Sequence, residues 1–159
     1  MLEYIMALAL TSPVFDHNGT IPKVYTCQGK DLSPALAWSG LPNGTKSVAL
    51  IVDDPDVPDP AAPKREWVHW VLYNIPAGTT GLAEAAKLPA GAREGKNDWD
   101  RRGYGGPCPP IGRHRYFHKL YALDVVLPDL NEPTKAGLLE AMNGHVLEEA
   151  ELIGTYQKE

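Results

Sequence analysis

The sequence predicts a mostly β domain with one or two helices late in the chain. Short apolar runs with strand-like alternation recur along the 159 residues, and turn-forming residues separate them. Fifteen glycines and fifteen prolines are spread along the chain, which is typical of many turns between short strands. We therefore expect one domain over residues 1–159, with residues 1–6 as a disordered or additional N-terminal extension.

The first third of the chain contains four predicted strands. They cover residues 7–14, 21–25, 35–38 and 47–52. The last of these, SVALIV, has almost no polar position, so we expect a strand that is buried on both faces. The following segment over residues 53–63, DDPDVPDPAAP, is too rich in proline for regular structure and is predicted to be a loop.

The next predicted strand, WVHWVLYNI, covers residues 67–75. Alternation assigns Trp67, His69, Val71 and Tyr73 to one face of it, and Val68, Trp70 and Leu72 to the other. Residues 82–100 are small, polar and punctuated by glycine, so we expect an irregular segment with one helical turn at 83–87.

A rigid loop, GGPCPPIG, precedes an aromatic strand predicted over residues 115–126. Alternation assigns His114, Tyr116 and His118 to one face of this strand and Arg115, Phe117 and Tyr121 to the other. Further on, Thr134 can cap a helix that runs through Met142 and ends at Gly144. The tail over residues 146–156 could prolong that helix, but its β-branched and aromatic residues favour a strand.

The acidic net charge of −5, with a pI near 5.5, argues against a nucleic-acid partner. No apolar segment is long enough to span a membrane, and the N-terminus lacks the basic region of a signal peptide, so we expect a cytoplasmic protein. Cys27 and Cys108 are too few for a disulfide framework and lack the spacing of metal ligands. We expect Cys108 to be reduced and buried beside a binding pocket, with a bond to Cys27 as the alternative.

Two loop–strand units carry the residues with the most chemistry. Asp54 and Asp56 lie on the first loop and His69 on the strand after it, and the second loop leads into His114 and Tyr116. If the two strands are neighbours, these side chains and the free glycine amides can hold a phosphate or another oxyanion. A nearby carboxylate would keep the histidines charged, so binding should strengthen below about pH 7. The same carboxylate could accept an ammonium group, as in a zwitterionic head group.

Two catalytic alternatives are weaker. The chain has no G-x-S-x-G motif, so no serine stands out as a nucleophile. A metal site built from Asp54, Asp56, His69 and His114 is chemically possible, but proline loops with glycine amides favour an anion over a cation. We therefore expect no catalytic residue, no metal and no cofactor.

Three motifs closely resemble the phosphatidylethanolamine-binding protein family, which is also called the Raf kinase inhibitor protein family. They are DPDVP at Asp54–Pro58, REWVHW at Arg65–Trp70 and GPCPPIGRHRY at Gly106–Tyr116. The segments SPALAWSGLP, NDWDRRGYGG and LYALD are similar to the bacterial and archaeal YbhB/YbcL branch. The resemblance runs from about Pro13 to the C-terminus.

The resemblance implies a large central antiparallel sheet, a smaller second sheet, a few peripheral helices and a small anion pocket. The ligand-binding residues that it implies are Asp54, Asp56, Trp67, His69, Gly106, Pro107, His114 and Tyr116. It also implies a cis peptide at Arg65–Glu66 and, on this branch, a homodimer.

The function implied is non-enzymatic binding of a phosphate or a phosphorylated or zwitterionic head group, similar to that of phosphatidylethanolamine. The alternative is a regulator that acts through a protein partner, such as a kinase or protease inhibitor. Lys64 departs from the aromatic residue of mammalian members, and no C-terminal helix follows Glu159. Lipid affinity and kinase inhibition are therefore expected to transfer less well than the anion pocket.

Overall fold

The computed structural model describes residues 6–159, so the expected extension at 1–6 lies, except for Met6, outside the described residues. Nine strands, a short 3₁₀ helix and an α-helix follow one another along this part of the chain. In order they are β1 (Ala9–Thr11), β2 (Gly19–Thr20), η1 (Lys23–Tyr25), β3 (Leu36–Ser39), β4 (Ser47–Val57), β5 (Arg65–Pro76), β6 (Gly81–Leu82), β7 (Arg93–Glu94), β8 (His114–Leu123), α1 (Lys135–Met142) and β9 (Val146–Tyr156).

The strands form two sheets, as the resemblance implies. The large sheet has six strands in the order β2-β9-β8-β4-β5-β7, and the small sheet has three in the order β1-β3-β6. All pairs are antiparallel except β2 and β9, which run parallel at Gly19 and Gly154. The predicted mostly β architecture is confirmed.

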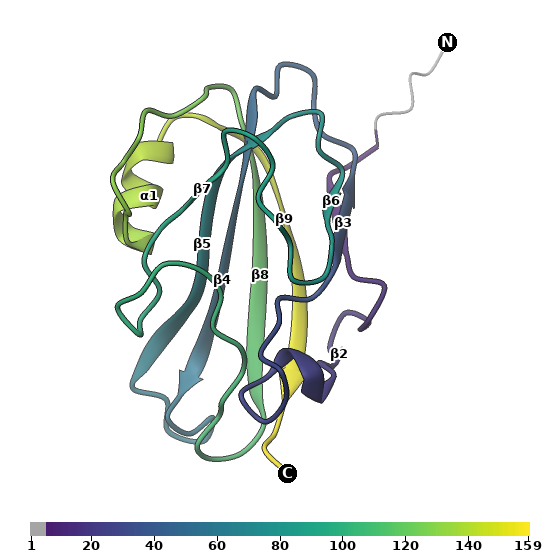
Figure 1. Cartoon of the computed structure of the whole chain (residues 1–159), viewed down its shortest axis with the longest axis vertical. Helices are drawn as coiled ribbons and strands as arrows, with labels where there is room; N and C mark the ends of the chain where they lie inside the picture. The colour runs from purple at the N-terminus through teal and green to yellow at the C-terminus, as the bar shows by residue number, and fades with distance from the viewer. Residues whose placement is uncertain (1–5) are drawn as a thin grey trace.

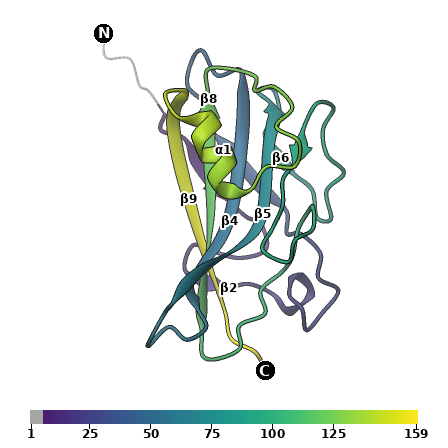
Figure 2. The ribbon, with the colours of Figure 1, turned by 90° about the vertical axis from the view of Figure 1, so that its left-hand side faces the viewer.

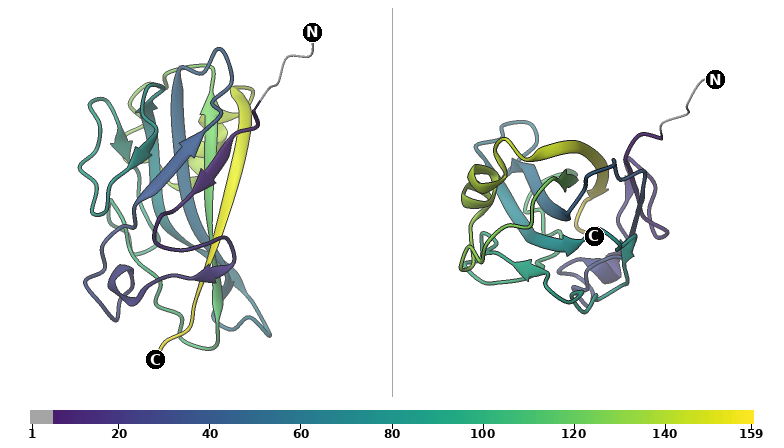
Figure 3. Two further views of the ribbon diagram at one scale, coloured as in Figure 1. Left: turned by 90° about the vertical axis from the view of Figure 1, so that its right-hand side faces the viewer. Right: turned by 90° about the horizontal axis from the view of Figure 1, so that it is seen from above.

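The large sheet lies between the small sheet and α1 (Figures 1 and 2). In the left view of Figure 3, β1 and β3 cross in front of the long strands. Leu50 and Leu120 pack toward the small sheet, whereas Ile51 and Leu138 belong to the core beneath α1. Both faces of β4 are therefore covered, which explains its uninterrupted apolar run.

β4 is longer than the sequence predicts, because the polar segment after its apolar run still pairs with its neighbours. Asp53 is opposite residues of both β5 and β8, and Asp54 is opposite a residue of β5. The register with β5 shifts after Asp54, so Pro55 lies at an irregularity where a missing amide proton is tolerated. The predicted loop over 53–63 therefore begins only beyond the end of β4.

A bulge at His69 breaks the alternation predicted for β5. Val68 is opposite Asp53 and Trp70 is opposite Val52, so His69 is the extra residue. The predicted faces are therefore wrong across the bulge, where Val68 changes sides, whereas the alternation from Trp70 to Tyr73 holds. Val68, Val71 and Tyr73 belong to the core under α1, whereas Trp70 and Leu72 belong to the core under the small sheet.

Three further expectations are wrong. The chain at 21–25 is not a strand, and Lys23–Tyr25 forms the 3₁₀ helix η1, in which Tyr25 N–H donates to the carbonyl of Pro22. The helical turn expected at 83–87 is absent, since Ala85 has a φ of 49°. The cis peptide of the described chain is Val57–Pro58, whereas Arg65–Glu66 lies in the paired start of β5.

The C-terminal elements match the predictions. The Thr134 hydroxyl accepts a hydrogen bond from Gly137 N–H and caps α1. Gly144 has a φ of 84°, which ends the helix and turns the chain into β9, so the helical alternative for the tail is excluded. Neither helix in the described part of the chain is long and apolar enough to cross a membrane.

Cys27 and Cys108 form a disulfide, with their Cα atoms 5.4 Å apart. The expectation of a reduced Cys108 is therefore wrong. Cys27 N–H also donates to the carbonyl of Pro107 at 3.0 Å, so the loop after η1 and the loop before β8 lie side by side. The two cysteines are 81 residues apart, and only the fold brings these loops together.

Candidate functional site

A cavity of about 250 Å³ opens at the end of the molecule where β4 and β5 meet the loop before β8. The same end carries the C-terminus (Figure 1). The cavity is lined by Asp54, Val57, Trp67, His69, Trp99, Cys108, Pro109, Pro110 and Tyr116. Four of the predicted site residues are in this lining, and four others, Asp56, Gly106, Pro107 and His114, are not.

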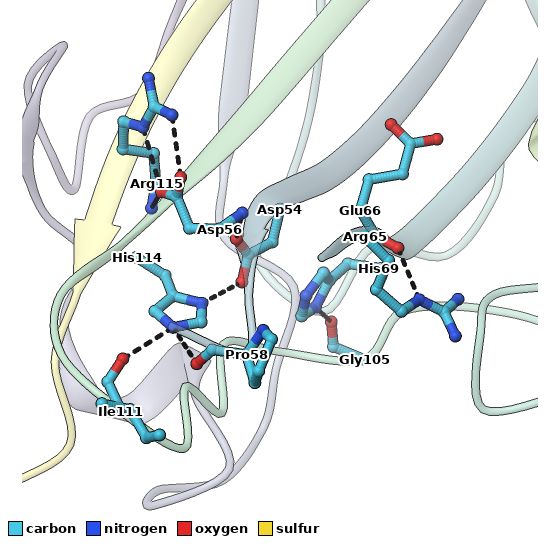
Figure 4. A network of polar contacts seen from close by, with 10 residues as sticks. All are labelled: Asp54, Asp56, Pro58, Arg65, Glu66, His69, Gly105, Ile111, His114 and Arg115. Carbon is cyan, nitrogen blue, oxygen red and sulfur yellow. Dashed lines mark hydrogen bonds and ion pairs between the residues drawn. The ribbon is translucent and has the colours of Figure 1, made fainter. Parts of the chain in front are cut away.

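His114 does not line the cavity, and it holds Asp54 in position through the contact that Figure 4 shows. Its Nδ1 is 2.6 Å from Oδ2 of Asp54, and its Nε2 is 2.9 Å from the carbonyl of Ile111 and 3.1 Å from that of Pro58. Because a carbonyl can only accept, Nε2 carries a proton, and neither ring nitrogen is left for a ligand. Burial raises the pKa of Asp54, and the hydrogen bond with His114 opposes that shift.

His69 faces the cavity as a neutral ring. Its Nδ1 donates to the carbonyl of Gly105 at 2.7 Å, which is the ring's one hydrogen bond within the described chain. Burial lowers the pKa of His69 to about 4, so the histidine is uncharged near pH 7 and its Nε2 presents a lone pair. The expected imidazolium is therefore wrong, because desolvation outweighs the nearby carboxylates.

Asp56 belongs to an ion pair outside the cavity. It accepts hydrogen bonds from the backbone N–H, Nε and Nη2 of Arg115 at 2.9, 3.0 and 2.8 Å. These bonds hold the pKa of Asp56 below its usual range. The pair ties the end of β4 to the start of β8 and thereby fixes the two strands that carry Asp54 and Tyr116.

Gly106 is needed for close packing and has no free amide. Its N–H donates to Oδ1 of Asp31 at 2.8 Å, and a Cβ here would overlap both that carboxylate and the carbonyl of Tyr25. The predicted glycine amide for an anion is therefore already used. Pro107 likewise contacts the neighbouring loop through its carbonyl.

Two buried donors at the cavity have no hydrogen-bond partner among the described residues. They are the hydroxyl of Tyr116 in β8 and Nε1 of Trp67 in β5. Tyr116 is only 1% exposed, and burial, followed by the charge of Asp54, raises its pKa. A buried donor without a partner is costly, so each of these groups is able to donate a hydrogen bond to a bound molecule.

A family model described as phosphatidylethanolamine-binding protein matches residues 11–157. The chain belongs to the phosphatidylethanolamine-binding protein family. A UPF0098 protein of Methanothermobacter thermautotrophicus is 51% identical over 94% of this chain and 98% of its own length. A UPF0098 protein of Chlamydia pneumoniae is 47% identical over 95% of this chain and 99% of its own length.

Solved structures of family members share the fold. A crystal structure of a homologue from Chlamydia trachomatis, 47% identical, superposes with a TM-score of 0.90 over 96% of this chain and 99% of that one. The YbcL protein of E. coli is 33% identical and has a TM-score of 0.86 over 97% of this chain and 100% of that one. The resemblance to this family and to its YbcL-like branch is confirmed.

In this family member, four residues of the cavity wall were not predicted from the sequence. Trp99 packs edge-on against Trp67 and His69, with ring centroids 5.6 and 5.0 Å apart, and stays 37% exposed at the rim. Val57, Pro109 and Pro110 complete the apolar wall. Trp99 stands in the NDWDRRG segment that carries the resemblance, so its sequence context was the available signal.

The four residues considered as metal ligands do not converge. Asp56 is bound to Arg115, and both ring nitrogens of His114 are used within the protein. In residues 6–159, no group of three or more His, Cys, Asp or Glu side chains has a metal-binding arrangement. The cavity instead offers two hydrogen-bond donors, a neutral imidazole and a carboxylate, within an apolar and aromatic wall.

Proposed function

We propose that this chain is a single-domain, non-catalytic binding protein whose cavity takes a phosphate group with one negative charge. The observation that carries the proposal is the pair of unpartnered buried donors, the Tyr116 hydroxyl and Trp67 Nε1. Two phosphoryl oxygens can accept these hydrogen bonds together. The small volume of the cavity suits such a group.

The charge of the cavity favours a singly charged ligand. His69 is neutral near pH 7 because its pKa is about 4, and none of the described residues that line the cavity is a lysine or an arginine. Asp54 would repel a phosphate dianion. A protonated phosphomonoester can instead donate its P–OH to Asp54 or to Nε2 of His69, and a phosphodiester carries a single charge at any pH near neutrality.

The lining supports binding without turnover. It includes no serine or threonine, and its cysteine is held in the disulfide, so the described wall offers no hydroxyl or thiolate nucleophile of the usual kind. The family model's description names a phospholipid, and its head group contains a phosphodiester of the proposed charge. A phosphorylated protein side chain, which the regulator alternative requires, is a phosphomonoester.

Titration calorimetry can distinguish a phosphodiester ligand from a phosphomonoester ligand. The probes are phosphoethanolamine, glycerophosphoethanolamine and O-phosphoserine at pH 5.5 and pH 8. We expect the two monoesters to bind more than about tenfold less tightly at pH 8, because their second pKa lies near 6, whereas the diester should change little. His69 does not titrate in this range, and a diester affinity that is the same at both pH values would assign the pH dependence to the ligand.

Variants test the location of the binding site. Tyr116→Phe should weaken binding of each bound probe by about tenfold, because it removes a donor to a charged group. His145→Gln is the control, since His145 pairs with Asp124 at the far end of β8. Absence of binding for all three probes, or equal affinities for wild type and Tyr116→Phe, would contradict the proposal. Phosphorus NMR should show the monoesters intact after incubation.

A further inference from the structure

The Cys27–Cys108 disulfide lies between solvent and the cavity. Cys27 is exposed on the loop after η1, whereas Cys108 is half-buried and lines the cavity. Exposed disulfides are the ones that thiols reach and reduce most readily. Cys27 therefore lies at the surface, while Cys108 belongs to the wall of the cavity.

The wall around Cys108 has few other constraints. No backbone hydrogen bond of the described chain reaches residues 108–110, and Pro109 and Pro110 have no amide proton to donate. The nearest anchors lie on either side, at the Pro107 carbonyl and at the Ile111 carbonyl. The disulfide is therefore the covalent link that holds this part of the wall against the loop after η1.

We propose that Cys27–Cys108 is a thiol–disulfide exchange site through which a small-molecule thiol sets the affinity of the cavity. A thiolate RS⁻ attacks the sulfur of Cys27, a mixed disulfide RS–S forms there, and Cys108 leaves as a thiolate. A second thiol then attacks the mixed disulfide, which releases RS–SR and leaves Cys27 reduced. Two thiols are oxidised to one disulfide while the protein disulfide becomes a dithiol, so electrons and protons balance.

Reduction should loosen the wall and weaken binding. The remaining hydrogen bonds, Gly106 N–H to Asp31 and Cys27 N–H to the Pro107 carbonyl, keep the loop near its position. Residues 108–110 must then be ordered again each time a ligand binds. A cytoplasmic location, which remains a prediction, would supply such thiols in excess.

The first test follows the exchange itself, and it does not depend on the proposed ligand. The folded full chain is treated with glutathione at pH 8 without denaturant, and the products are mapped by mass spectrometry. We expect a glutathione adduct on Cys27, then two free thiols with the circular dichroism spectrum retained. Hydrogen exchange at the amides of Cys27 and Gly106, which donate to the Pro107 carbonyl and to Asp31, should become faster after reduction. Resistance to reduction until the protein unfolds, or unchanged exchange, would overturn the proposal.

The second test measures the coupling to binding, which rests on the proposed function. Phosphoethanolamine is titrated into oxidised wild type, pre-reduced wild type and Cys27→Ser, a change outside the cavity lining. We expect the last two to bind about three- to tenfold more weakly, as when one or two side chains must be immobilised on binding. Dithiothreitol should not change Cys27→Ser. Equal affinity in all three would refute the coupling, whereas no binding to oxidised wild type would refute the proposed function and leave the first test to decide.

Discussion

The hydroxyl of Tyr116 is buried beside Asp54 and His69, yet it has no hydrogen-bond partner among the described residues. The Tyr116 ring also packs edge-on against His69, with centroids 5.2 Å apart. The aromatic ring therefore contributes to packing, while the hydroxyl costs stability until a ligand accepts its proton. We infer that this side chain is kept for binding.

This inference predicts that Tyr→Phe substitutions at two positions have opposite effects on the free energy of unfolding. Tyr116→Phe should leave the free energy of unfolding of the ligand-free protein unchanged or raise it by up to about 1 kcal/mol, because an unsatisfied buried group is removed. Tyr73→Phe is the matched control. Its hydroxyl accepts from Leu130 N–H at 3.0 Å, so its loss should cost about 1–2 kcal/mol. Urea unfolding measures both, and equal losses would contradict the assignment.

At the scale of the elements, β9 fixes the position of β8 and is itself packed tightly at Gly154. Gly154 is opposite Tyr116 in the antiparallel ladder and opposite Gly19 in the parallel one. A Cβ on Gly154 would come within 2.7 Å of Cδ1 of Ile21 and 2.9 Å of Cε2 of Phe15. The absence of a side chain there lets the N-terminal segment pack against the sheet behind the cavity.

Gly154→Ala should therefore destabilise the protein by about 1–3 kcal/mol through overpacking. Gly78→Ala is the control, because a Cβ there would meet nothing within 4 Å and its φ is not positive. That change should be neutral or slightly stabilising. Thermal and urea unfolding would report the difference, and an equally stable Gly154→Ala protein would show that Ile21 and Phe15 can move aside.

At the scale of the whole molecule, stability depends on two buried neutral histidines, which lie on the strands that carry the site. Burial lowers the pKa of His69 and of His118 to about 4, although carbonyl groups accept hydrogen bonds from both rings. In the unfolded chain each histidine binds a proton near pH 6.5. The unfolded state therefore binds more protons than the native state between pH 6.5 and 4, so stability falls as the pH falls through this window.

Each of these two histidines should lower the free energy of unfolding by about 2 kcal/mol when the pH falls from 7 to 5. Urea unfolding of wild type, His69→Asn and His118→Gln at both pH values would test this. Each variant should lose about half of the pH dependence that the two histidines cause. His145→Gln should keep the full pH dependence, because the His145 side chain is partly exposed. A wild-type pH dependence retained in both variants would mean that other groups cause the acid sensitivity.

Local sequence patterns predicted several features correctly. The apolar runs predicted β4, β5 and β8, Thr134 and Gly144 predicted the two ends of α1, and the β-branched tail predicted β9. Each of these features depends on residues within one element, where alternation or capping acts over a few positions. The motifs of the two loops also identified the family and four of the residues that line the cavity.

By itself, then, the sequence determined the family, most of the long elements and the strands that carry His69 and Tyr116, but it placed Asp54 on a loop. The tertiary structure decided the ionisation and the partners of these residues. Desolvation of His69 depends on every segment packed around it, and the partner of Gly106 is an aspartate 75 positions away. The disulfide and the bulge in β5 likewise arise where distant segments meet. Ionisation, hydrogen-bond partners and cross-links are properties of neighbours in space, and local sequence spacing does not specify those neighbours.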